Sequence, residues 1–367
     1  MTIRRTLLKS AAAAFALSLA APVTAQAGET TRVVATFSIL GDIVKRIGGE
    51  HVALTTLVGP DGDAHVYQPT PADARAVSDA EVLIVNGLEF EGWLDRLAEA
   101  ADFDGTLVVA TSGIKPIAFA DDHGDEGHGE HAEGKHDDHH DEEHAEGEHG
   151  HDHHDEEHAE GEHGHDDHDE HAEGEHDEEH AEHGHGHGHD HGAFDPHAWQ
   201  SLKNAVTYVD NITAALAAAD PAHAAVFQAN RAAYVAEIEA LDAEISSMMA
   251  ALPDGKRTVV TSHDAFGYFT ESYGVDFKAP IGLSTESEAS AADVAELIEQ
   301  IREEGISAVF VETITDNRLL QQIANETGAT IGGTLYSDAL SGPDGPAATY
   351  LDMMRHNART IARALAV

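Results

Sequence analysis

The sequence contains no cysteine. This absence excludes disulfide bonds, a lipid-modified N-terminal cysteine and thiolate ligands for a metal. Basic residues are scarce as well, because 20 lysines and arginines stand against 68 aspartates and glutamates and give a formal net charge of −48. Such a chain is a poor partner for nucleic acids and anionic membrane surfaces, and a good partner for cations.

Histidine, in contrast, is abundant and clustered. Residues 121–192 hold 23 of the 29 histidines and 30 of the 68 acidic residues, with Lys135 as the one basic residue. The phrase DEEHAEGEHGHD occurs at 141–152 and again at 155–166. Without hydrophobic periodicity this His-rich segment cannot offset the entropy of ordering, so we predict that it is disordered when metal-free. An acidic solubilising spacer would explain its carboxylates but not its histidines, so we favour a collector of metal ions.

The first 27 residues have the features of an export signal. Arg4, Arg5 and Lys9 precede the apolar run AAAAFALSLAA, and AQA at 25–27 is a small-residue cleavage site. The apolar run is too short for a helix that spans a bilayer. IRRTLLKS also resembles a weak twin-arginine signal, so Sec and twin-arginine export both stay open. We expect a soluble periplasmic protein whose mature chain begins near Gly28.

The remaining sequence predicts an α/β fold. Runs rich in β-branched residues alternate with amphipathic helical patterns from residue 31 up to the His-rich segment, and again after residue 257. This βαβα order predicts parallel sheets with helices on both faces. Between the two stretches, a helical pattern follows Asp220–Pro221 for about 30 residues, or about 45 Å at 1.5 Å per residue. We therefore predict two (β/α) lobes with parallel sheets, joined by a long rigid α-helix.

The predicted organisation has four parts. They are a signal peptide at 1–27, an N-terminal α/β lobe at 28–219 that carries the loop 121–192, a linking helix at 220–253, and a C-terminal α/β lobe at 254–367.

Candidate metal ligands stand where predicted strands end. His65 and His263 follow strands, at the edge where open α/β sheets bind ligands, and so does Asp338. His197 stands at the start of a helix. Three imidazoles and one carboxylate form a zinc-type ligand set. Spacing alone leaves each of these residues open to an ordinary structural role.

Other histidines and nearby carboxylates have weaker claims. We expect His51 to be a surface turn residue, and His223 and His356 to be solvated or locally hydrogen-bonded. Asp63, Asp195 and Asp264 neighbour the candidate histidines, and either fix imidazole tautomers or cap local structure.

Four motifs resemble a known family. GDAHVYQPTPAD, DPHAWQS, TSHDAFGYF and LYSDAL, in this order, resemble the cluster A-I solute-binding proteins of metal ABC transporters. More narrowly, they resemble the zinc-binding members that carry a His-rich loop. The resemblance covers about residues 30–367. It implies two lobes, a rigid linking helix and a metal in the cleft between the lobes.

The resemblance also implies the ligands. The family's first three ligands fall on His65, His197 and His263, and its carboxylate ligand falls on Asp338. Manganese-type members place glutamate at the third position, so His263 favours zinc. Some zinc members recruit a glutamate immediately before the first histidine; here that residue is Ala64, which leaves Asp338 or water as the fourth ligand.

The function that follows is transport rather than catalysis. The resemblance implies a periplasmic protein that captures Zn²⁺ and delivers it to an ABC permease, with lobe tilt separating His65 and His197 from His263 and Asp338. Periplasmic zinc chaperones are further candidate partners, and we expect a monomer. The alternatives are a manganese-binding member of the same family, a zinc buffer, or a zinc hydrolase. A hydrolase is disfavoured because the sequence has no HExxH motif and no evident general base paired with a nucleophile.

Overall fold

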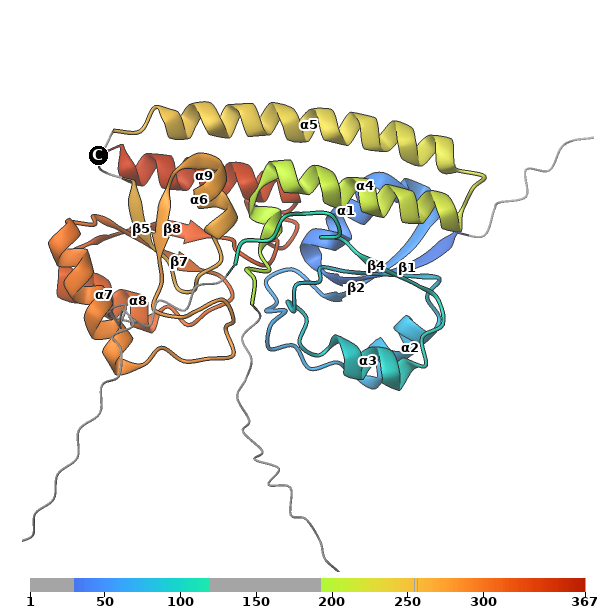
Figure 1. Cartoon of the computed structure of the whole chain (residues 1–367), viewed down its shortest axis with the longest axis horizontal. Coiled ribbons are helices and arrows are strands. Elements are labelled where there is room, and N and C mark those ends of the chain that lie inside the picture. The colour runs from blue at the N-terminus through green and yellow to red at the C-terminus, as the bar shows by residue number, and fades with distance from the viewer. Residues whose placement is uncertain (1–29, 119–192, 254, 256, 367) are drawn as a thin grey trace, which may run out of the picture. The chain divides into compact units, whose positions relative to one another are not determined.

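The computed structural model describes residues 30–118, 193–253, 255 and 257–366. All of them belong to one compact unit (Figure 1). The predicted signal peptide and the His-rich segment lie outside the described residues. None of the helices in the described ranges has the length and apolar character needed to cross a bilayer.

The first lobe is built on a four-stranded sheet in the order β2-β1-β3-β4, with every neighbouring pair parallel. Its strands are β1 (Thr31–Phe37), β2 (Val52–Val58), β3 (Val82–Val85) and β4 (Thr106–Val109). Its helices are α1 (Ser38–Gly48), η1 (Gly49–His51), α2 (Pro71–Ser78) and α3 (Leu94–Ala101). All four residues of β3 are buried, which explains its continuous apolar run VLIV.

The second lobe repeats this topology in a second four-stranded parallel sheet of order β6-β5-β7-β8. Its strands are β5 (Thr258–Val260), β6 (Asp276–Lys278), β7 (Ala308–Glu312) and β8 (Thr330–Leu335). Its helices are α6 (Gly267–Tyr273), α7 (Ala291–Glu304), α8 (Arg318–Thr327) and α9 (Tyr350–Leu365). The prediction of two parallel-sheet α/β lobes is therefore confirmed.

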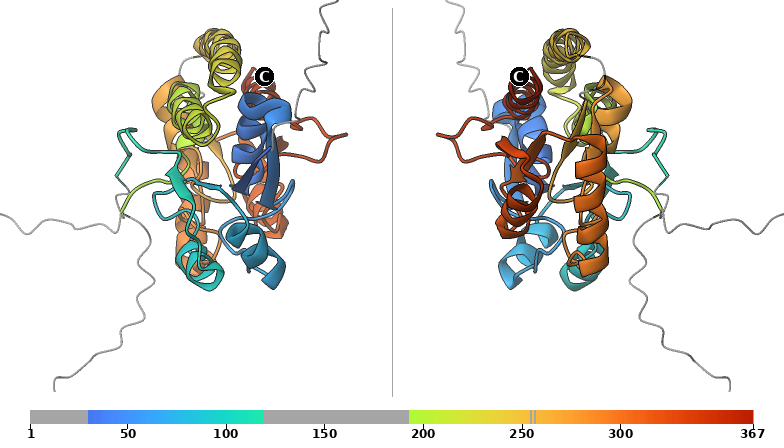
Figure 2. Two further views of the ribbon diagram at one scale, coloured as in Figure 1. Left: turned by 90° about the vertical axis from the view of Figure 1, so that its right-hand side faces the viewer. Right: turned by 90° about the vertical axis from the view of Figure 1, so that its left-hand side faces the viewer.

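The connection between the lobes runs through η2 (Ala198–Gln200), α4 (Leu202–Ala219) and α5 (Ala224–Ala250). The 27 residues of α5 correspond to about 40 Å. Its buried side chains recur every three, four or seven residues and form one apolar stripe: Phe227, Tyr234, Ile238, Leu241, Ile245 and Met249. Along this length α5 packs against α1 of the first lobe, against α4, and against α6 and α9 of the second lobe (Figures 1 and 2).

The hydrophobic core is continuous between the lobes. One cluster of buried side chains runs from the first sheet through α4 and α5 to Phe310 and Leu335 in the second lobe. A smaller cluster packs α7 and α8 on the second sheet. Because the larger core is shared, we expect lobe tilting to be limited in amplitude.

Candidate metal site

His65 lies in the loop between β2 and α2. Its backbone N–H donates to Asp63 Oδ1 at 2.9 Å, and the indole of Trp93 donates to the preceding carbonyl of Ala64 at 2.7 Å. The ring of Phe90 meets the imidazole edge-on, with ring centres 4.7 Å apart. These contacts fix the loop on both sides, and the His65 side chain is only 5% exposed.

His197 is oriented by a carboxylate two residues earlier. Asp195 Oδ1 accepts from the backbone N–H of His197 at 2.9 Å and lies 2.8 Å from its Nδ1. The acceptor places the proton on Nδ1, so the Nε2 lone pair is free to face the cluster. Asp195 is itself held through its carbonyl, which accepts the Tyr268 hydroxyl at 2.9 Å.

His263 follows β5 and has the same kind of partner, supplied by another strand. Glu312, the last residue of β7, places Oε2 2.8 Å from His263 Nδ1. Its Oε1 accepts the backbone N–H groups of Ser262 at 2.7 Å and of His263 at 3.1 Å. Glu312 therefore fixes both the backbone and the ring of His263, and it is fully buried.

Sequence reasoning missed Glu312. Of the three aspartates proposed to fix tautomers, Asp195 contacts the ring of its histidine, whereas Asp63 binds a backbone N–H. Asp264 is joined through its own backbone N–H to the carbonyl of Ile281. The sequence did contain a signal for a role of Glu312. It is a charged residue at the end of the buried run AVFVE, and a buried charge is costly without a partner.

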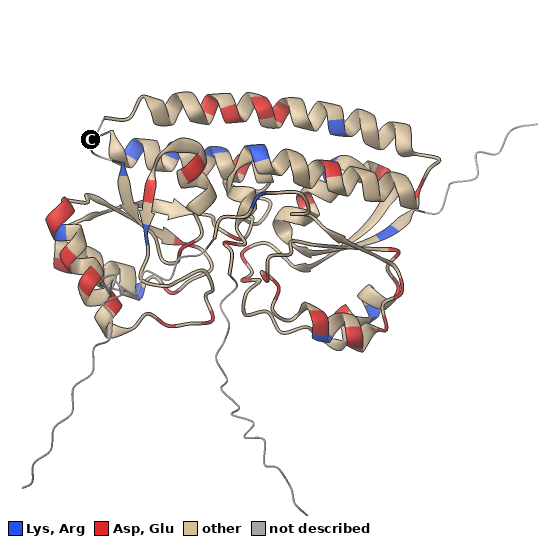
Figure 3. Cartoon of the chain, viewed as in Figure 1, with Lys and Arg blue, Asp and Glu red and all other residues tan. Residues whose placement is uncertain are grey.

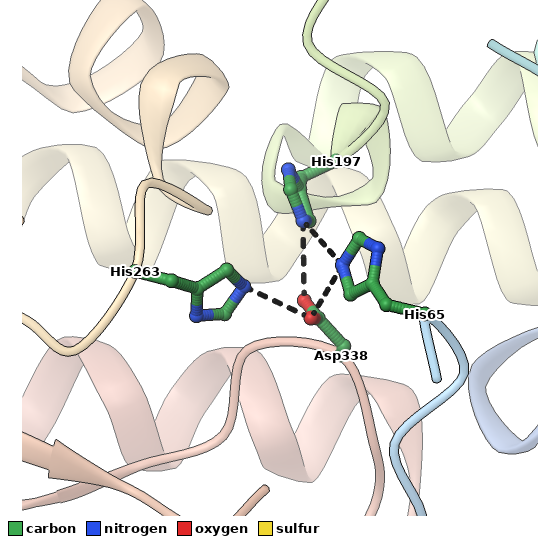
Figure 4. Close-up of side chains that lie close together, drawn as sticks. All are labelled: His65, His197, His263 and Asp338. Carbon is green, nitrogen blue, oxygen red and sulfur yellow. Dashed lines mark hydrogen bonds and ion pairs between the residues drawn. The ribbon is translucent and has the colours of Figure 1, made fainter. Parts of the chain in front are cut away.

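The four predicted side chains converge, although they come from four separate loops (Figure 4). Asp338 Oδ2 lies 3.3 Å from His65 Nε2 and 3.0 Å from His263 Nε2. Asp338 Oδ1 lies 3.6 Å from His197 Nε2, and the Nε2 atoms of His65 and His197 are 3.4 Å apart. One potential ligand atom from each residue lies within 4.8 Å of all the others, and all four residues are buried.

These distances match the size of a bound divalent ion. Ligands about 2.05 Å from a tetrahedral ion are separated from one another by about 3.4 Å. In addition, the buried Asp338 Oδ1 has no hydrogen-bond partner. A buried carboxylate oxygen in that position is unfavourable unless a proton donor or a cation satisfies it.

The charges of the cluster are coupled. Burial opposes ionisation of Asp338, but the adjacent His263 and His197 and the hydrogen bonds from His263 and His65 hold its pKa well below the usual range. Burial lowers the pKa of His65 despite the neighbouring carboxylate. For His263, burial is outweighed by the carboxylates of Glu312 and Asp338, which raise the pKa well above the usual histidine value. A cation bound by the cluster would therefore compete with a proton for His263.

A strained turn forms the apolar wall of the cluster. Three consecutive residues, 87–89, have positive φ, and two of them are not glycine. The buried carboxylate of Glu91 holds this turn by accepting backbone N–H groups within it. The turn presents Phe90, whose ring lies 4.7 Å from that of His65 and 5.9 Å from that of His197.

The Asp338 loop is hydrogen-bonded to residues outside the second lobe. The carbonyl of Ser337 accepts from the indole of Trp199 at 2.9 Å, and the backbone N–H of Leu340 donates to the Ser38 hydroxyl at 2.9 Å. The expectation that lobe tilt separates two histidines from a pair formed by His263 and Asp338 is therefore too simple, because Asp338 is also tied to the first lobe.

The remaining histidines of the described ranges lie outside the cluster. His51 and His223 stack with ring centres 3.9 Å apart, and His223 Nδ1 contacts Asp220. His356 Nε2 lies 3.0 Å from the carbonyl of Thr334. The contact of His223 with Asp220 is local, as the sequence predicted, whereas the other two contacts join segments that are distant in the sequence.

The chain is similar to known metal-binding proteins over most of its length. A family model described as ZnuA, zinc-uptake complex component A periplasmic, matches residues 33–364. The manganese-binding lipoprotein MntA of Halalkalibacterium halodurans is 29% identical over 343 residues, which cover 93% of this chain and 91% of that protein. The iron-binding protein YfeA of Yersinia pestis is 29% identical over 332 residues, or 90% and 85% of the two chains. The periplasmic zinc-binding protein TroA of Treponema pallidum has a similar structure, with a TM-score of 0.70, 25% identity, and coverage of 92% of this chain and 100% of that one.

Proposed function

The chain belongs to the ZnuA family of periplasmic metal-binding proteins of ABC transporters, and from this premise we propose that it captures Zn²⁺ and delivers it to an ABC permease. Proteins of this family bind a divalent metal and work with a membrane permease; they are not enzymes. The choice of zinc and the assignment of the ligands are our proposals.

The proposed ligands are the Nε2 atoms of His65, His197 and His263 and the carboxylate of Asp338. The observation that carries this assignment is the convergence of these atoms within 4.8 Å of one another, with four of the separations at 3.0–3.6 Å. Asp338 is preferred to water as the fourth ligand because its carboxylate is fully buried and already lies among the three imidazoles.

Zinc is favoured by the donor types. Three imidazole nitrogens and one carboxylate suit a tetrahedral Zn²⁺ ion, whereas manganese prefers an oxygen-rich site of higher coordination number. A manganese carrier is the second candidate, because MntA is a relative and both oxygens of Asp338 face the cluster. A bidentate carboxylate would raise the coordination number in that case.

The choice between the metals is open to a direct test. Tryptophan fluorescence is followed while Zn²⁺ and Mn²⁺ compete for the wild-type chain and for a His263→Glu variant, which exchanges an imidazole for a carboxylate. Zinc should outcompete manganese in the wild type, and the variant should show a relative gain for manganese. Equal affinities in the wild type, or no relative gain in the variant, would refute zinc selectivity by this mechanism.

The parts of the chain outside the described residues complete the proposal. We assign 1–27 to a cleaved signal peptide, in line with the absence of a cysteine for lipid attachment. Residues 121–192 would collect metal ions for the site. We also assign 28–219 to an N-terminal lobe, 220–253 to a linking segment whose helix is α5 (Ala224–Ala250), and 254–367 to a C-terminal lobe. The proposed partners are a permease and, in the periplasm, zinc chaperones, with the protein acting as a monomer.

A further inference from the structure

The carboxylate of Asp63 joins the loop of His65 to a segment that packs against the loop of His263. Its Oδ1 accepts the backbone N–H of His65 at 2.9 Å, and its Oδ2 accepts the hydroxyl of Thr285 at 2.6 Å. Asp63 lies in the loop after β2 of the first lobe, whereas Thr285 lies between β6 and α7 of the second. One carboxylate therefore connects the backbone of a first-lobe ligand to the second lobe.

The segment that ends in Thr285 is also attached to the loop of His263. Ile281 forms an isolated parallel bridge with His263, and the backbone N–H of Asp264 donates to the Ile281 carbonyl at 3.1 Å. Segment 281–285 is therefore held against the His263 loop at one end and reaches the first lobe at the other.

Other polar contacts between the lobes follow different routes. They run through α6, through Tyr350 of α9, and through the loop of Asp338, where the carbonyl of Leu340 also accepts the backbone N–H of Asp61 from the loop of His65. Among the hydrogen bonds within the described ranges, the bond from Thr285 to Asp63 alone joins segment 281–285 to the loop of His65.

We propose that Thr285 is a positioning residue that slows metal release by holding the His65 and His263 loops together. The inference rests on the proposed function, because it requires both histidines to be ligands. An ion leaves a site of several ligands stepwise, and a detached ligand rebinds efficiently only while its local concentration at the ion stays high. Thr285 maintains that concentration without touching the ion.

The chain provides its own reporter for this process. Both tryptophans are buried beside the cluster: Trp93 donates to the carbonyl that precedes His65, and the Trp199 ring lies 5.3 Å from that of His197. Residues 121–192 contain no tryptophan. Tryptophan fluorescence of the full-length chain therefore reports on this site and not on metal bound to the His-rich segment.

The experiment measures zinc dissociation from the full-length chain loaded with one equivalent of Zn²⁺. The complex is mixed with an excess of a chromophoric chelator, and release is followed by tryptophan fluorescence and by chelator absorbance. Thr285→Val removes the hydroxyl at nearly constant size, and Thr285→Ser retains it. Ser284→Ala is the matched control, because that hydroxyl accepts the backbone N–H of Glu286 within its own segment.

We expect Thr285→Val to release zinc about five- to tenfold faster, the effect of losing one hydrogen bond. Thr285→Ser and Ser284→Ala should stay within about twofold of the wild type. Loss of this hydrogen bond should lower the Tm of metal-free Thr285→Val by no more than about 2–4 °C; a purely structural bond would do the same and leave the release rate unaffected.

Two results would overturn the proposal: an unchanged release rate in Thr285→Val, or an equal acceleration in Ser284→Ala. A failure of the proposed function is distinguishable, because a His263→Ala chain would then respond to Zn²⁺ as the wild type does. The His263→Ala result does not depend on the zinc release rates of the Thr285 variants.

Discussion

At the residue scale, two histidines of the cluster are oriented by carboxylates of different origin. His197 takes its partner, Asp195, from two positions earlier in the chain, whereas His263 takes Glu312 from a neighbouring strand. In both cases the carboxylate also binds the backbone of the same histidine. Each carboxylate therefore orients both the ring and the main chain of its histidine. The Nε2 atoms are thus in position before an ion arrives.

Glu312→Gln tests this arrangement. The neutral amide no longer provides two carboxylate oxygens, so the ring of His263 loses its preferred tautomer and its electrostatic support. We expect zinc affinity to fall by about 10- to 100-fold, the usual range for partners of metal ligands. Fluorescence titration with a competing chelator measures it, and Glu303→Gln on the exposed face of α7 is the control. Equal affinities for the two variants would contradict a role for Glu312.

The pH dependence of binding follows from the raised pKa of His263. The raised pKa favours the protonated form of His263, so Zn²⁺ competes with that proton, and affinity should rise with pH by about tenfold per unit for each proton released. Burial lowers the pKa of His65, so protons compete for that imidazole only at lower pH. Calorimetry in buffers of different ionisation enthalpy counts the protons. A flat affinity between pH 5 and pH 7.5 would be incompatible with this set of ligands.

The residues that the sequence identified differ from those it missed in how far their placement depends on tertiary packing. His65, His263 and Asp338 follow recognisable strands, so the edge rule for parallel sheets placed them together. Glu312 also ends a strand, but its pairing with His263 depends on β7 lying beside β5. Strand order is set by tertiary packing, which local periodicity does not encode. Thr285 was missed for the same reason.

At the scale of elements, close packing between α6 and the loop before η2 sets the position of Asp195. A Cβ added to Gly267 at the start of α6 would lie 2.4 Å from Asp195 Oδ2. The glycine therefore allows the helix to approach the carboxylate that orients His197. Its φ is not positive, so the requirement is one of space and not of backbone conformation.

Gly267→Ala should consequently weaken zinc binding without direct contact with the ion. Displacement of Asp195 would release the His197 ring, and we expect a loss of affinity of about tenfold or more, with a destabilisation of about 1–3 kcal/mol from overpacking. Gly92→Ala is the control, since an added Cβ there meets no atom within 4 Å. Chelator competition and thermal unfolding measure the two effects; wild-type affinity in Gly267→Ala would contradict this role of the close approach.

The linking helix was predicted well because its pattern is local. The break at Asp220–Pro221 is real: α4 ends at Ala219 and α5 begins at Ala224. The predicted helix was a few residues too long at its start, because residues 221–223 form a turn in which Asp220 accepts the backbone N–H of His223.

At the scale of the whole molecule, a shared core and a long helix limit how far the lobes can separate. Arg355 and Arg359 on α9 form ion pairs with Glu244 on α5, which adds to the apolar stripe along that helix.

Acidic side chains are spread over both lobes in the described part of the chain (Figure 3). Such a surface attracts cations without fixing them, while the buried cluster provides the specific ligands.

Deletion of residues 121–192 should remove the zinc ions collected by the His-rich segment and leave the ion bound at the buried cluster. The full-length chain is expected to bind several zinc ions, and the deleted chain one, with the same tight event in both, because none of the four proposed ligands lies in the segment. Isothermal titration gives both stoichiometry and affinity. Loss of the tight event on deletion would make the His-rich segment the primary site.

The most direct measurement of the central claim is a fluorescence-detected zinc titration of four full-length chains under chelator competition: the wild type, His65→Ala, His197→Ala and His263→Ala. Each imidazole supplies one of four proposed bonds to the ion, so each substitution should weaken the site reported by tryptophan by at least about tenfold. The wild type should saturate that signal at one equivalent of Zn²⁺. Wild-type affinity in all three variants would show that zinc does not bind where these side chains converge.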